Sequence, residues 1–188
     1  MQNMETAQCA KEMAQAEKLL GGTLTPAEKF LVGILTQTKA LRSSAEELFN
    51  IYRNEPYRFP DLTKERYPDL PKYQIESVEL LEGEWDQVGS KRRWTFVDDQ
   101  CGTWDDMVED INDQAMSITW TLKKGIVPQQ RYKMLKVVHQ FFARKHGCLA
   151  TVTLVYMKKH VGIPAPHDYM KFLIKMLEAA DEAGTNEE

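Results

Sequence analysis

Between residues 73 and 158, apolar and polar side chains alternate with a period of two. Met116, Ile118, Trp120 and Leu122 fall on one face of an extended segment, and the residues between them are serine and threonine. Successive side chains of a β-strand point to opposite faces, so this alternation predicts a strand with one apolar and one polar face. Strands of this kind are typical of an antiparallel sheet that packs on one side only.

Three further segments continue this pattern. Their members on the apolar face are Trp94 and Phe96; Leu135, Val137, His139 and Phe141; and Val152, Leu154 and Tyr156. Two glycine-containing stretches, Glu82–Ser90 and Ala143–Gly147, separate strand-like runs. Because glycine adopts backbone conformations that other residues avoid, we expect a hairpin connection at each.

Outside this region the pattern favours helices and one more strand. A strand is predicted from Phe30 to Leu41. Ser44 and Glu47 have the spacing of a capping box, which predicts a helix through Tyr52. Four prolines restrict residues 55–71 to short helical pieces.

Near the end of the chain the apolar residues recur at steps of three and four. The residues of this stripe are Tyr169, Phe172, Leu173, Met176, Leu177 and Ala180. This period predicts a long amphipathic helix. The element order gives an α+β domain in which this helix buries its stripe against the apolar face of the sheet.

The N-terminal segment is expected to lie outside this domain. Residues 4–20 are rich in helix-forming residues and are followed by Gly21 and Gly22. We therefore expect a helical, loosely attached extension over residues 1–28, the main domain over residues 29–183, and a disordered tail over residues 184–188. The extension carries few large apolar residues, so it should be dispensable for folding.

Composition narrows the classes of function. Net charge is -4, from 24 basic and 28 acidic residues in 188, which argues against a nucleic-acid-binding protein. The three cysteines form no paired motif, and no apolar run of membrane-spanning length or signal peptide is present. We expect a cytoplasmic monomer without a membrane span. The short basic cluster Lys91–Arg93 and the acidic run that begins at Asp105 are expected on a solvated sheet face.

The Glu82–Ser90 loop, E-G-E-W-D-Q-V-G-S, and several pieces around it occur in an order and spacing that resemble a known family. Further pieces are Ser44–Tyr52, Ser117–Trp120, Tyr132–Lys133, Leu154–Tyr156 and Pro164–Tyr169. From about residue 29 to residue 182, the ordered set resembles the plant major latex proteins, within the birch-pollen-allergen (Bet v I) superfamily. The N-terminal extension and Trp104 depart from that pattern, so the chain resembles a divergent member.

The resemblance implies a helix-grip (START-like) fold, a curved antiparallel sheet around the long C-terminal helix. It also implies an internal cavity for a hydrophobic small molecule and an association with defence or stress responses. From the pattern alone, a packed core is the more economical interpretation of the same residues. The residues expected to line the cavity are Trp94, Phe96, Met116, Ile118, Trp120, Leu135, Val137, His139, Val152, Leu154, Tyr156, Phe172, Leu173 and Met176.

An enzyme of specialised metabolism, an isomerase or condensing enzyme on an alkaloid-like or phenolic substrate, is the alternative. His139 and Tyr156 are its candidate acid and base, although no third residue that would orient the histidine is evident. The glycine loop lacks the Gly-Lys-Ser/Thr ending of a nucleotide-binding loop. No calcium-loop or zinc spacing occurs, so we expect neither a metal nor a cofactor.

Overall fold

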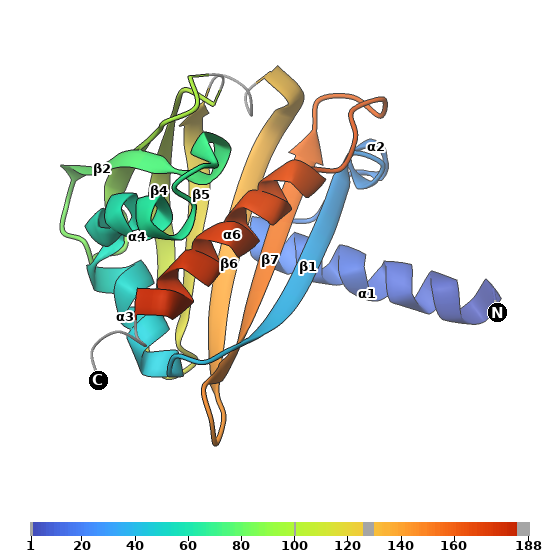
Figure 1. Ribbon diagram of the computed structural model, residues 1–188. Coiled ribbons are helices and arrows are strands. Elements are labelled where there is room, and N and C mark those ends of the chain that lie inside the picture. The colour runs from blue at the N-terminus through green and yellow to red at the C-terminus, as the bar shows by residue number, and fades with distance from the viewer. Residues whose placement is uncertain (1, 100, 126–129, 184–188) are drawn as a thin grey trace.

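The computed structural model describes residues 2–99, 101–125 and 130–183 (Figure 1). Its central element is a seven-stranded sheet with the strand order β1-β7-β6-β5-β4-β3-β2, in which every neighbouring pair is antiparallel. The strands are β1 (Val32–Leu41), β2 (Ile75–Glu82), β3 (Lys91–Phe96), β4 (Thr103–Asn112), β5 (Ser117–Gly125), β6 (Tyr132–Ala143) and β7 (Cys148–Lys158).

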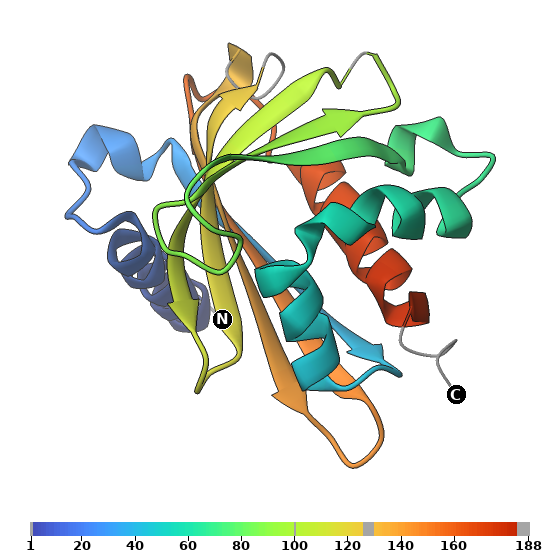
Figure 2. The ribbon, with the colours of Figure 1, turned by 90° about the vertical axis from the view of Figure 1, so that its left-hand side faces the viewer.

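The sheet curves around one long helix, α6 (His167–Ala183) (Figures 1 and 2). The shorter helices α3 (Ala45–Asn54) and α4 (Phe59–Arg66) lie on the same concave side, with the 3-10 turns η1 (Pro56–Arg58) and η2 (Pro71–Tyr73). The predicted apolar stripe of α6 is buried from Phe172 to Ala180. The expected α+β helix-grip fold is confirmed, as are both hairpin connections.

The helix starts follow local sequence. Ser44 and Glu47 form the predicted capping box of α3, in which the Ser44 hydroxyl accepts from the Glu47 N–H. The strand predicted from Phe30 begins two residues later, because a short helix, α2 (Pro26–Lys29), precedes it. Thr25 and Glu28 form a second capping box there, with the same Ser/Thr-x-x-Glu spacing as Ser44 and Glu47.

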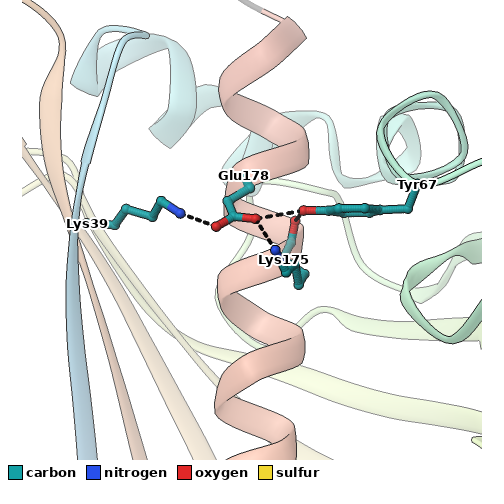
Figure 3. Close-up of polar contacts among 4 residues, drawn as sticks. All are labelled: Lys39, Tyr67, Lys175 and Glu178. Carbon is teal, nitrogen blue, oxygen red and sulfur yellow. Dashed lines mark hydrogen bonds and ion pairs between the residues drawn. The ribbon is translucent and has the colours of Figure 1, made fainter. Parts of the chain in front are cut away.

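Glu178 of α6 joins three elements on the concave side (Figure 3). Its carboxylate forms ion pairs with Lys39 of β1 and, at 2.7 Å, with Lys175. It also accepts a hydrogen bond from the hydroxyl of Tyr67, which lies just beyond α4, with an oxygen–oxygen distance of 2.9 Å. Burial alone would raise the pKa of Glu178, but hydrogen bonds from Lys175, Lys39 and Tyr67 together lower it to about 2. The carboxylate therefore ties α6 to the edge strand and to the end of α4.

Helix α1 (Gln2–Leu20) lies on the convex side of the sheet, opposite α6 (Figure 2). Its last turns contact the domain: Ala16 is buried, and the Lys136 ammonium donates to the Leu19 carbonyl at 2.6 Å. Leu24 is buried just beyond the helix, and its N–H donates to the Glu17 carboxylate at 3.1 Å. That the extension is dispensable stays a prediction. The expected tail from residue 184 lies outside the described residues.

Candidate functional site

A pocket of about 500 Å³ opens at the end of the sheet where β3, β4, η2 and the start of α6 meet. We call it the rim pocket. Its aromatic lining consists of Tyr73, Phe96, Trp104, Tyr169 and Phe172. The volume falls in the range of about 300–1,000 Å³ that is usual for small-molecule sites.

Strand register and helix period bring four of these rings together. Phe96 is the last residue of β3, and Trp104 lies near the start of the paired strand β4. Tyr169 and Phe172 are three residues apart on α6, so they lie on one face. The Phe172 ring meets those of Phe96 and Trp104 at 5.3 and 5.8 Å, and the Trp104 ring meets that of Tyr169 at 5.3 Å. These tilted and edge-on contacts leave an apolar wall suited to a flat ligand.

The polar lining of the rim pocket is mostly charged. It consists of Lys72, Asp98, Cys101, Arg131, Asp168 and Lys171. Burial foremost, with the neighbouring Asp98 charge, raises the pKa of the Cys101 thiol. Burial likewise raises the pKa of the Tyr169 phenol above its ordinary range. Both groups therefore keep their protons at neutral pH.

The residues expected to line a cavity fall into three groups. Phe96 and Phe172 line the rim pocket. Met116 lines a smaller pocket of about 330 Å³ beside α3. The other eleven are buried and line neither of these pockets: Trp94, Ile118, Trp120, Leu135, Val137, His139, Val152, Leu154, Tyr156, Leu173 and Met176. Ligand contact by these eleven stays a prediction.

Aromatic rings fill the space between the sheet and helices α3 and α4. The Tyr52 ring contacts those of Phe59 at 5.0 Å and Phe141 at 5.6 Å, and Phe59 meets Trp94 at 5.7 Å. Three of these four rings, those of Tyr52, Phe59 and Phe141, are outside the predicted wall. Helix residues such as Tyr52 and Phe59 could not be placed against the sheet from sequence. The apolar strand face is thus covered here by protein side chains.

His139 lies inside this network. Its ring stands between Tyr52 at 4.3 Å and Trp120 at 5.9 Å, and it is 1% exposed. Within the described chain, neither ring nitrogen has a hydrogen-bond partner. Burial foremost, with the positive charge of Arg92, lowers the pKa of His139 to about 3, so the imidazole is neutral at physiological pH. Neither His139 nor Tyr156 lines the rim pocket.

A buried ion pair corrects the expectation of a solvated Lys91–Arg93 and Asp105 region. The Arg92 guanidinium donates twice to the Asp106 carboxylate, at 2.8 and 3.0 Å, and both residues are at most 2% exposed. The Trp94 indole N–H donates to the same carboxylate at 2.8 Å. Because Arg92 is two residues from Trp94, the period of the strand already places it on the inner face.

Sequence reasoning missed several residues of the rim pocket. Tyr73, Cys101 and Lys72 lie in turns or loops, where no period indicates which way a side chain points. Trp104 stands out in the sequence only as a departure from the resembled family. Across the described residues, no group of three His, Cys, Asp or Glu side chains could hold a metal ion. The same part of the chain contains no helix that is long and apolar enough to cross a membrane.

Comparison with known proteins identifies related chains and folds. The profile of the pathogenesis-related protein Bet v 1 family matches residues 31–184. MLP-like protein 328 of Arabidopsis thaliana is 27% identical over 143 residues, which cover 76% of this chain and 89% of that protein.

Two solved structures share the fold. Major latex-like protein 151 of Panax ginseng superposes with a TM-score of 0.73 at 19% identity, over 82% of this chain and 98% of that one. Norcoclaurine synthase of Thalictrum flavum, in complex with dopamine and hydroxybenzaldehyde, superposes with a TM-score of 0.64 at 16% identity, over 89% and 95% of the two chains.

Proposed function

This chain belongs to the pathogenesis-related protein Bet v 1 family, and on that premise we propose that it binds a hydrophobic small molecule in the rim pocket. The observation that carries the proposal is the grouping of five aromatic rings around a space of about 500 Å³. Burial of an apolar ligand against such rings contributes roughly 25 cal/mol per Å² of apolar surface removed from water.

The location of the site distinguishes this proposal from one that uses the interior of the sheet. Below Phe96, the inner face is occupied by Trp94, the Arg92–Asp106 pair and the rings around His139. Interiors of this kind are close-packed, and a ligand there would have to displace protein side chains. We therefore assign the ligand to the loop end of the grip.

Two tryptophans on adjacent strands provide a matched test. Trp104 lines the rim pocket, whereas Trp120 is 6% exposed and lies beside His139. Aminoanthracene, a neutral fluorescent probe, should quench the intrinsic fluorescence of the wild type on titration. The variant Trp104→Phe should lose most of this quenching, and Trp120→Phe should keep it. Loss of quenching in Trp120→Phe alone would refute the assignment to the rim pocket, and absence of binding would refute the proposed function.

The alternative is an enzyme of specialised metabolism that uses the same pocket, and one comparison favours it: norcoclaurine synthase shares the fold. Such chemistry needs one well-placed acid or base. Asp168, Lys171 and Tyr169 of α6 are the titratable candidates at the pocket wall. Incubation with dopamine and hydroxybenzaldehyde, followed by mass spectrometry, tests this alternative. Recovery of both compounds unchanged would contradict catalysis of that condensation.

The proposal includes an association with defence or stress responses and a cytoplasmic location, on the ground of family membership alone. Transcript and protein levels before and after pathogen challenge test the first part. Imaging of a fluorescent fusion protein tests the second. An unchanged protein level, or a signal confined to another compartment, would contradict the respective part.

A further inference from the structure

The rim pocket carries an excess of positive charge around its aromatic wall. Its charged residues are three cations, Lys72, Arg131 and Lys171, and two carboxylates, Asp98 and Asp168. Asp98 already takes part in an interaction of the folded chain. None of the three cations forms an ion pair with a carboxylate among the described residues.

Several basic side chains elsewhere in the described chain are held by carboxylates. Among these, Arg93 pairs with Asp105, Lys91 with Glu82, and Lys39 and Lys175 with Glu178. At the rim pocket the Lys72 ammonium instead lies 5.0 Å from the centre of the Tyr73 ring. Cations that outnumber the carboxylates at a concave apolar site favour a ligand with negative charge.

The neutral polar groups of the pocket favour the same kind of ligand. Lysine and arginine side chains only donate hydrogen bonds. The Tyr169 phenol keeps its proton, so it too can donate, and its ring faces that of Trp104. The pocket therefore offers donors and positive charge at its polar positions and ring surfaces at its apolar positions.

From this combination we propose that the ligand of the rim pocket is a flat aromatic molecule that carries a carboxylate. The rings of Trp104, Phe96 and Phe172 contact the aromatic frame, and Lys171 and Lys72 attract the carboxylate. This inference rests on the proposed function, since it names the ligand class of the same pocket. A ligand with a protonated amine should bind poorly there.

Three probes of nearly equal shape test the charge preference: naphthoate, naphthamide and naphthylmethylamine. Their affinities for the full chain are measured by calorimetry at neutral pH. We expect naphthoate to bind about tenfold more tightly than naphthamide, and the amine to bind more weakly than both. The difference between naphthoate and naphthamide should shrink as ionic strength rises from about 0.01 M to about 1 M, because the Debye length falls from about 30 Å to about 3 Å.

Neutralising variants locate the effect. Lys171 and Lys72 are exposed and make no ion pair in the described structure, so Lys171→Gln and Lys72→Gln should fold normally. Each should weaken naphthoate binding about two- to fivefold and leave naphthamide binding unchanged. The control is Lys145→Gln, in the exposed turn between β6 and β7, which should change neither affinity.

The outcomes separate this inference from the proposed function. If naphthamide binds as tightly as naphthoate, or if Lys171→Gln and Lys72→Gln weaken both probes equally, the carboxylate preference is wrong and the rim pocket remains a binding site for neutral aromatic ligands. If none of the three probes binds, and aminoanthracene does not bind either, the proposed function is wrong as well.

Discussion

Breaking the ion pair between Arg92 and Asp106 should cost far more stability than breaking the neighbouring pair on the opposite face of the same two strands. Arg92 and Asp106 are at most 2% exposed, and Asp106 also accepts the Trp94 indole proton. Removing one partner of a buried pair leaves an uncompensated charge and costs about 3–5 kcal/mol. We therefore expect Arg92→Met to lower the free energy of unfolding by about that amount.

The control pair is Arg93 and Asp105, which share the same strands and the same bidentate geometry, at 2.7 and 2.9 Å. The Arg93 side chain is 40% exposed, so Arg93→Met should cost at most about 1 kcal/mol. In Arg92→Met/Asp106→Leu, both charges are gone and part of the lost stability should return. The residual loss should be about 1–3 kcal/mol, because the Trp94 N–H then lacks its acceptor.

Urea denaturation followed by tryptophan fluorescence measures the free energy of unfolding of these variants, with far-ultraviolet circular dichroism as a second probe. The difference in the free energy of unfolding between Arg92→Met and Arg93→Met shows whether the inner pair is shielded from water. Equal losses for the two variants would refute the reasoning, because they would mean that water reaches the inner pair as freely as the outer one.

Three other perturbations have defined outcomes. Glu178→Gln should lower stability by about 1–2 kcal/mol above about pH 4.5. This difference in stability between variant and wild type should fade towards about pH 2, because the folded-state pKa of Glu178 is about 2 and protonation removes the ion pairs of the wild type. A difference that does not change with pH would contradict this. Gly33→Ala should lower the free energy of unfolding by about 1–3 kcal/mol, because the added Cβ would lie 2.2 Å from the Tyr156 hydroxyl oxygen. The control is Gly22→Ala, whose Cβ would meet nothing within 4 Å and which should leave the thermal midpoint unchanged. Deletion of residues 1–22 should shift the thermal midpoint only slightly, since Ala16 is the one fully described side chain of α1 that is buried; a shift of more than about 8 °C would show that α1 is part of the core.

The sequence predicts the sheet and the final helix well because their periods report directly on burial. Strand residues such as Ile118 and Trp120 and helix residues such as Leu173 and Met176 are buried as the alternation and the stripe indicate. The same periodicity could not reveal what lies opposite each face. That depends on α3 and α4, whose side chains, such as Tyr52, reach the sheet only in the folded chain.

The rim pocket was harder to predict for a related reason. Elements from distant parts of the chain, η2, β3, β4 and α6, meet there. Several of its residues, such as Lys72, Tyr73 and Cys101, lie in segments without a regular apolar period. The inner Arg92 is a different case. Its position two residues before Trp94 indicates that its side chain points to the inner face. An arginine is rarely buried without a partner, however, and its partner Asp106 is fourteen residues away along the chain. Register between β3 and β4 is what reveals the pair.

The central claim is that ligand binds at the rim pocket and not within the aromatic interior, and the indole N–H signals of the four tryptophans test it most directly. In a heteronuclear NMR titration with aminoanthracene, the signal of Trp104 should move with saturation, because its ring lines the pocket. The signals of Trp94, bonded to Asp106, and of Trp120, beside His139, should move much less. Large shifts of Trp94 and Trp120 with an unmoved Trp104 would contradict the account.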